Sequence, residues 1–501
     1  MNQGPSRPRP TPGTPPQPRC PVHAQAVPLY RNAHRSDHAL LWEELRARFG
    51  AVAPVEISPG VPGWLLLGYH ENLNVLRNPV SFSTDPARWR EAREGRQENR
   101  VGGTALAADG ERHRRMRTPL VEALHALSGR RLSRTVTRLA SSLVDRFATT
   151  GRADLIADYA APLPAMVLNF LFGLDDRYGD LLARLCAARD GDDPDAAERA
   201  TADLRRYVRA LVARRRAEPG DDLVSRLLAH PVALTDAEVA TEVETLLRLG
   251  VEPTAHLIGN ALRLLLTQPE VAAAYRGAAL PSVDFLDYVM WADPPLQALQ
   301  ARYPTHDVRI GGADIKEGEA LVLGFAPAHA DPATRRGHAL DDLAGNRSHL
   351  MWGAGPHGCP ARALASEVAA TAIDVLLDRL DPKLDGPPEQ LRWRASLSVH
   401  GLAALPVVFP PEPAPAVPQQ PAPRPRRRLL ARTARRTAAP RGARYGAPGD
   451  TAEPPAPRTP TARHARVPAP ASRATGARYH VPAPADEPRP DPLEGLLAQW
   501  A

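Results

Sequence analysis

The segment from Trp352 to Ala361, which reads WGAGPHGCPA, carries the residues best suited to chemistry. It places one cysteine, Cys359, among three glycines and two prolines, just before a segment with helical spacing of apolar residues. Glycines allow a flat ligand to approach the backbone closely. The free N–H groups and the dipole of a following helix stabilise a thiolate, and such a thiolate can bind haem iron and donate electron density to it. A buried, inert cysteine in a turn is the alternative interpretation.

The periodicity of apolar residues predicts which elements must position this cysteine. Helices are expected over 40–49, 111–127, 133–149, 164–188, 196–216, 236–268 and 361–380. Strands are expected over 64–67, 308–310 and 320–325. The helix over 236–268 must kink, because Pro253 has no N–H to donate to the Leu249 carbonyl. The fold class is therefore mostly α with a minor β component.

The cysteine segment resembles the haem-binding loop of the cytochrome P450 superfamily, which runs aromatic-Gly-x-Gly-x-x-x-Cys-x-Gly. In this chain Trp352 takes the place of the usual Phe, and Ala361 takes the place of the last Gly. The resemblance extends over about residues 25–410. It implies a single large domain with the cytochrome P450 fold, haem b (iron-protoporphyrin IX) as the cofactor, and Cys359 as the ligand of its iron.

The same resemblance implies how the two haem propionates are held. They would be bound by residues that match the family's propionate ligands: His113, Arg117, Arg302 and His349. The physical requirement is that two buried carboxylates need cationic or hydrogen-bonding partners. The alternative for any one arginine is a solvated surface charge.

The chain departs from the family where the central helix usually reads Ala-Gly-x-acid-Thr. Here the acid is kept as Glu252, but Pro253 replaces the alcohol that helps to deliver protons, and Thr254 lies about 100° further round the helix. We expect Glu252 and ordered water to carry protons, with Thr254 as the nearest hydroxyl, and turnover that releases peroxide. The alternative role for Glu252 is a cap or salt bridge at the kink.

A second departure affects the family's Glu-x-x-Arg motif, whose positions are Tyr288 and Trp291 here, with Asp287 one residue out of register. A buried ion pair can often be replaced by packed apolar groups, so we expect Tyr288 and Trp291 to pack where the pair would lie. This resembles an actinobacterial branch of the family that lacks the motif. The alternative is a degenerate chain that binds haem poorly.

The two ends differ in composition from the body, because residues 1–30 and 411–501 hold 29 of the 55 prolines. We expect a disordered Pro-rich arm over 1–24 and a disordered Pro/Ala/Arg-rich tail over 411–501. The tail ends in an apolar pattern that suits a short amphipathic helix over 492–500, which is either a docking segment for a protein partner or an incidental terminus. Of the net charge of +7, the arm carries +3 and the tail +8, so the body carries −4 and nucleic acid is not an expected partner.

These features together suggest one function and two alternatives. With three cysteines, no apolar run near the ~18 residues of a membrane span and no signal sequence, the chain is expected to be cytoplasmic. The resemblance implies a haem-thiolate monooxygenase that inserts one oxygen atom from dioxygen into a small organic substrate. Electrons would come from a ferredoxin and its reductase, docked with the help of Arg112, Arg114 and Arg115. The alternatives are a catalytically weak haem-binding regulatory or scaffold protein that acts with signalling partners, and a peroxide-driven enzyme.

Overall fold

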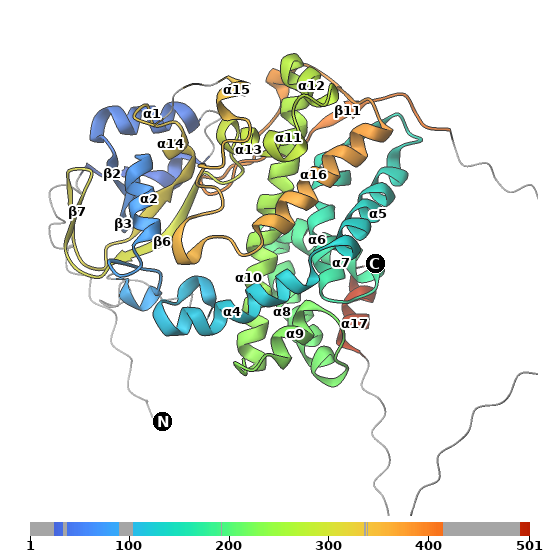
Figure 1. Cartoon of the computed structure of the whole chain (residues 1–501), viewed down its shortest axis with the longest axis horizontal. Helices are drawn as coiled ribbons and strands as arrows, with labels where there is room; N and C mark the ends of the chain where they lie inside the picture. Colours follow the sequence, from blue (N-terminus) through green and yellow to red (C-terminus); the bar gives the residue numbers. More distant parts are fainter. Residues whose placement is uncertain are drawn as a thin grey trace, which may run out of the picture. The chain divides into compact units, whose positions relative to one another are not determined.

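The computed structural model of the chain describes residues 25–33, 38–89, 104–191, 193–334, 337, 339–413 and 491–500. Helices predominate among them, as expected (Figure 1). The helices are α1 (His38–Phe49), α2 (Tyr69–Arg77), α4 (Gly110–Leu127), α5 (Arg130–Phe147), α6 (Pro162–Leu171), α7 (Asp176–Arg189), α8 (Pro194–Ala217), α9 (Leu223–Ala229), α10 (Asp236–Gly250), α11 (Glu252–Thr267), α12 (Pro269–Arg276), α13 (Ser282–Ala292), α14 (Phe325–His329), α15 (Leu340–Leu343), α16 (Arg362–Arg379) and α17 (Pro492–Gln499). No described helix is long and apolar enough to cross a membrane.

The strands form one sheet of six and two smaller sheets. The large sheet has the order β1 (Val27–Pro28), β2 (Val52–Ser58), β3 (Val61–Leu66), β9 (Leu321–Gly324), β6 (Ala298–Pro304) and β4 (Phe82–Ser83). β3 pairs with β9 in parallel, and β6 pairs antiparallel with β9 on its other side. The smaller sheets are β10 (Lys383–Leu384), β11 (Pro406–Val408) and β5 (Arg152–Asp154), and the hairpin of β7 (Val308–Ile310) and β8 (Ala313–Ile315). The three strands expected from the sequence are present, whereas β2 and β6 were not predicted.

The expected long helix over 236–268 is two helices, α10 and α11, that meet at Val251. Pro253 is the second residue of α11, a position where proline is well tolerated because its missing N–H would have no partner in the first turn. The backbone N–H of Ala255 then bonds to the Val251 carbonyl and starts the second ladder. Proline therefore sets the junction, as the sequence predicts, but as a break between helices rather than as a kink within one.

The prediction of a single helix over 164–188 is wrong, because the structure has two helices, α6 and α7, separated by residues 172–175. Gly173 adopts a positive φ of 71°, which ends α6. Apolar residues continue through this turn as Phe172 and Leu174, and both are buried. The apolar pattern therefore continued although the helix had ended.

Helices α11 and α16 lie side by side at the centre of the main core (Figure 1). The face of α16 that carries Val368, Ala372, Ile373 and Leu376 is buried, and the helix also packs against α5 and α13. This packing fixes the start of α16, where the cysteine segment enters it.

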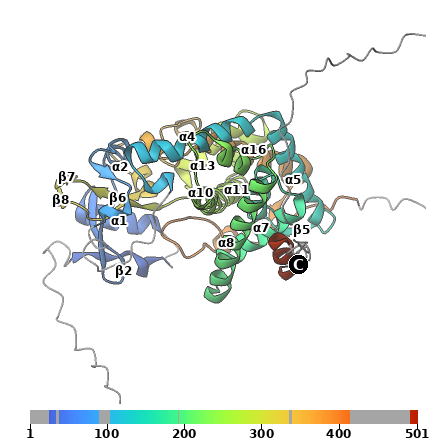
Figure 2. The same cartoon turned by 90° about the horizontal axis from the view of Figure 1, so that it is seen from below.

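The C-terminal helix α17 packs against α8 and α7 of the same compact unit (Figure 2). Leu493 and Leu496 are fully buried there, and Glu494 accepts a hydrogen bond from Tyr178 and pairs with Arg177 at 2.6 Å. The amphipathic helix expected over 492–500 is thus present, and it docks on its own chain. The arm over 1–24 and the rest of the tail, 414–490, lie outside the described residues.

Candidate functional site

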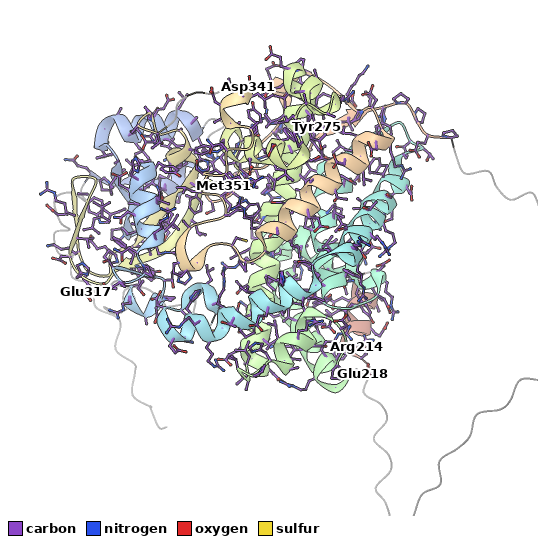
Figure 3. All side chains as sticks on the ribbon, viewed as in Figure 1. Arg214, Glu218, Tyr275, Glu317, Asp341 and Met351 are labelled. Carbon is purple, nitrogen blue, oxygen red and sulfur yellow. The ribbon has the colours of Figure 1, made fainter. Side chains whose placement is uncertain are left out.

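A cavity of about 220 Å³ lies between α10, α11 and the segment that leads into α16. Most of its wall is apolar, with Leu246, Leu249, Leu296 and Leu299 as examples. Met351 is part of this wall and lies between the sheet and the central helices (Figure 3). The cavity therefore suits a largely apolar ligand.

Cys359 faces this cavity from a tight loop. Its backbone N–H donates to the Trp352 carbonyl at 2.7 Å, which closes the loop over the intervening residues. Gly353 and Gly355 adopt positive φ values of 66° and 67°, and a Cβ on Gly355 would lie 2.5 Å from the Leu76 carbonyl oxygen. Glycine is therefore required at Gly355 both by the turn and by the close approach of α2.

The sequence predicts that the free N–H groups at the start of the following helix stabilise the Cys359 thiolate, and in the structure the burial of the thiol opposes this effect. The surrounding protein raises the pKa of the thiol, and this effect exceeds the opposing effects of the Ala361 N–H and the Arg117 and Arg362 charges. A bound metal ion would provide the missing stabilisation, because coordination deprotonates a thiol. The thiolate is thus expected only when a metal is bound.

Cationic and donor groups gather on one side of the cavity. Arg117 and Arg302 line the wall, and Arg117 donates a hydrogen bond to the Gly358 carbonyl. His357 also lines the wall, and its ring contacts that of His113 in a tilted arrangement, with centroids 4.1 Å apart. His113 lies just behind the wall, and burial and the nearby charges of His357 and Arg117 lower its pKa to about 4.

His349 is placed differently from the other expected propionate ligands. It is fully buried, and its Nε2 lies 3.1 Å from Asp287 Oδ1 on α13. Like His113, it is not one of the residues that line the cavity. Its Nδ1 has no hydrogen-bond partner among the described residues, so a propionate role for His349 stays a prediction.

Comparison with known proteins decides the family. No family model matches the chain. Cytochrome P450 107B1 of Saccharopolyspora erythraea is 31% identical over 379 residues, which cover 72% of this chain and 93% of that protein. The chain belongs to the cytochrome P450 superfamily. Mycinamicin IV hydroxylase/epoxidase of Micromonospora griseorubida is also 31% identical, over 73% of this chain and 96% of its own. The structure of CYP154C4 from Streptomyces sp. W2061 matches with a TM-score of 0.69 at 26% identity, covering 76% of this chain and 97% of that one.

The cofactor of this P450 is haem b, and the cavity offers the donors that haem needs. Cys359 faces the cavity as a thiol ligand, while Arg117 and Arg302 provide cations for the propionates. His113 Nε2 and His357 Nδ1 are buried and have no hydrogen-bond partner among the described residues. Unpartnered buried donors are costly unless a ligand satisfies them, so the residues of this chain fit the group.

His357 is a site residue that the sequence analysis missed. It lines the cavity, and its Nε2 lies 3.7 Å from Asp109 Oδ1. Burial opposes ionisation of Asp109, but the nearby His357 and hydrogen bonds from Ser83 and Thr84 hold the pKa of Asp109 below its ordinary value. The available signal was its position in the loop, two residues before Cys359.

The two expected proton carriers of this P450 face different cavities. Thr254 lines the main cavity, together with Pro253. Glu252 lines a second cavity of about 260 Å³, whose wall is polar and includes Arg189 and Arg394. Burial opposes ionisation of Glu252, but His256, whose Nε2 lies 3.5 Å from Glu252 Oε1, and the charges of Arg394 and Arg189 lower the pKa of Glu252 below its ordinary value. Glu252 is thus held as a carboxylate beside polar space.

Tyr288 and Trp291 are buried, as expected where the Glu-x-x-Arg pair is lost. Tyr288 donates to Gln268 at 2.9 Å, and the Trp291 indole N–H donates to the Asn346 carbonyl at 2.7 Å. The buried charge is kept one residue earlier, because Asp287 contacts His349 and also lies 3.5 Å from Arg347 Nε. Helix α13 is therefore still tied to the segment that leads into the cysteine loop.

Proposed function

We propose that this P450 is a haem-thiolate monooxygenase that inserts one oxygen atom from dioxygen into a small organic substrate. The observation that carries the proposal is Cys359 facing an apolar cavity whose one side is lined by Arg117 and Arg302. A cytoplasmic location is part of the same proposal. Its relatives include proteins named as hydroxylases, such as 6-deoxyerythronolide B hydroxylase of Saccharopolyspora erythraea.

The residues that bind the haem and the substrate have separate roles. Cys359 would hold the iron, and Arg117, Arg302, His113 and His349 would hold the propionates, with His357 as a further partner. When bound, haem supplies the activation of dioxygen. The apolar side chains of α10 and α11 exclude bulk water and orient the substrate.

Proton delivery would use residues that differ from the usual family pattern, because Pro253 replaces the alcohol next to Glu252. Glu252 takes protons from the polar cavity, where its carboxylate lies 3.5 Å from His256 Nε2. Thr254 presents a hydroxyl to the main cavity and can pass a proton on through ordered water. The route must pass the junction of α10 and α11 at Pro253.

Electrons are proposed to come from a ferredoxin and its reductase. Arg112 and Arg114 are exposed on α4, where an acidic partner could reach them. Arg114 pairs with the exposed Glu111 at 2.5 Å, and Arg115 pairs with Glu238 at 2.6 Å. A protein partner for the tail remains part of the proposal, but it would have to compete with the contacts that α17 makes on α7 and α8.

One observation favours a peroxide-driven enzyme as a second candidate. Glu252 is not in the wall of the main cavity. The residue next to it, whose hydroxyl would pass protons from Glu252 to this cavity, is replaced by Pro253. A reaction that starts from peroxide does not need this proton route. A regulatory or scaffold role would apply only if neither route gave product.

Product analysis distinguishes these candidates. The holoenzyme is incubated with a panel of small apolar compounds and supplied with ferredoxin, reductase and isotopically labelled dioxygen, or in parallel with peroxide alone. We expect a product that carries one labelled oxygen atom in the first reaction. Product with peroxide only would select the peroxide-driven enzyme, and no product in either would contradict the proposal.

A further inference from the structure

Glu242 is a buried acidic residue of α10 that none of the tasks above uses. Its side chain is 2% exposed and lines the main cavity. One carboxylate oxygen, Oε1, accepts a hydrogen bond from the backbone N–H of Ala105, in the short helical turn Ala105–Ala107. The other oxygen, Oε2, has no hydrogen-bond partner among the residues that the structure describes.

The charges near Glu242 are committed elsewhere. Arg117 on α4 is close enough to influence Glu242, but it donates to Gly358 and faces the propionate side of the cavity. Glu238, one turn earlier on α10, is paired with Arg115 at 2.6 Å. No described residue forms an ion pair with Glu242, although a buried carboxylate without a cation is costly.

A purely structural role does not explain a carboxyl group at this position. The Ala105 N–H needs one acceptor, which an amide or hydroxyl would supply without burying an acid. The neighbouring parts of the wall, Leu106, Leu120 and Leu246, are apolar and cannot solvate it. A partner for the ionised form of Glu242 would therefore come from within the cavity, which its side chain lines.

We propose that Glu242 binds a cationic nitrogen of the substrate, so that the substrates of this P450 are amines with an apolar body. A cationic nitrogen beside Glu242 would form an ion pair with the carboxylate in a site screened from water, where charges attract each other more strongly. The apolar wall would hold the rest of the molecule. The inference rests on the proposed function, because it names the substrate class of the same cavity.

The titration of Glu242 provides a signature of such binding. Burial raises the pKa of Glu242 to about 7, so the free protein carries a partly protonated carboxyl at neutral pH. A cation in contact with the carboxyl favours its ionised form. Binding should therefore release roughly half a proton near pH 7, and only if Glu242 is the contact.

The test uses the holoenzyme and two probes of equal chain length, decyltrimethylammonium and decanol. The quaternary ammonium has no lone pair and cannot coordinate iron. Calorimetric titrations in buffers of different ionisation enthalpy give both affinity and proton release. We expect at least tenfold tighter binding of the ammonium, and Glu242→Gln should abolish that preference and the proton release while decanol binding is unchanged.

Two further variants keep the test decisive. Thr245→Val changes the same wall of α10 without altering charge and should keep the preference, as should Glu242→Asp, which retains the carboxylate. If Glu242→Gln does not retain haem, Glu242→Met, which has a similar volume and no charge, replaces it and should lose the ammonium preference and the proton release in the same way. An equal loss of both probes in the Glu242 variants, or no ammonium preference in the wild type, would overturn the inference.

The reduced carbon monoxide spectrum of the same preparations separates this inference from the proposed function. A thiolate-type spectrum together with no ammonium preference would reject only the role of Glu242. A spectrum without the thiolate signature would reject the proposed function itself.

Discussion

Glu252 and Thr254 are two positions apart, yet their side chains face different cavities. The junction of α10 and α11 turns Glu252 toward polar space beside Arg189 and Arg394, and leaves Thr254 in the wall of the apolar cavity. Proton transfer from one to the other must cross Pro253, which offers neither an N–H nor a hydroxyl. We therefore expect proton delivery to fail most often at Pro253, with release of peroxide in place of product.

Pro253→Thr should improve the coupling of electron consumption to product. The new hydroxyl lies in the wall of the main cavity, next to Glu252 in the chain, and shortens the proton route. Peroxide released per electron pair should fall at least about twofold, since a positioned proton donor contributes strongly to rate. Pro253→Ala restores the backbone N–H without the hydroxyl and is the matched control. Equal peroxide release in all three proteins would contradict the argument.

Glu242→Gln should change how stability depends on pH. The folded protein holds the Glu242 proton up to a pKa of about 7, above the ordinary value of 4.5, so it binds more protons than the unfolded chain between these values. This group therefore makes the free energy of unfolding fall as pH rises, by at most ~1.4 kcal/mol per pH unit. The stability of Glu242→Gln relative to wild type should rise from about pH 5 to about pH 7 and then level off. Urea unfolding at several pH values measures this, and a constant difference would contradict it.

Contacts between helix α13 and the segment 345–349 hold the chain in place just before the cysteine loop. Asp287 contacts His349 and Arg347, Trp291 donates to Asn346, and the Gly345 N–H donates to the Asp284 carbonyl. These contacts join the helix to the chain a few residues before the loop begins. A buried acid–base pair is thus retained although the usual motif is absent.

Asp287→Asn should weaken this support. The change removes the charge that faces the buried His349 and Arg347, which costs about 1–3 kcal/mol of stability for a buried hydrogen-bonded charge. We expect a lower melting temperature and faster loss of haem to apomyoglobin. Asp284→Asn is the matched control on the same helix, because Asp284 is more exposed and lies 3.9 Å from Arg347. If both variants lose haem at the same rate, Asp287 has no special role.

Helix α17 is held by two buried leucines and by polar contacts at both of its ends. Asp491 lies 3.5 Å from Arg214, which is labelled in Figure 3, and the Trp500 indole N–H donates to Asp203 at 2.8 Å. Leu496→Ala should free the helix, since a buried Leu→Ala change costs about 2–5 kcal/mol and an isolated helix of this length is unstable. Amide hydrogen exchange in α17 should rise without a change in the haem spectrum. Unchanged exchange would show that the leucine does not hold the helix.

Charge is unevenly distributed along the chain. The body has a net charge of −4, whereas the arm over 1–24 and the tail over 411–501 together carry +11. The tail is not part of the cavity, since no residue beyond 413 lines it among those described. Deleting residues 411–501 should therefore leave haem binding intact and lower the melting temperature by a few degrees, through loss of the α17 contacts. Loss of haem on deletion would show that the tail belongs to the haem fold.

Local pattern predicted the features that depend on neighbouring residues in the chain. The cysteine loop, the junction at Pro253 and the amphipathic α17 follow from glycine, proline and apolar spacing. Pairings between distant segments could not be predicted in this way, because packing decides them: His349 meets Asp287, and Glu242 faces the cavity. The split of α6 from α7 was missed because the apolar residues run through the turn at Gly173.

The most direct test of the account is the absorbance spectrum of the dithionite-reduced holoenzyme with carbon monoxide, recorded for wild type and Cys359→Ala. The account predicts a thiolate-type Soret shift in the wild type, which shows that Cys359 ionises on the iron despite the raised pKa of its free thiol. The shift should be absent in Cys359→Ala. A wild-type spectrum typical of a neutral proximal ligand, or the same spectrum in both proteins, would contradict the account.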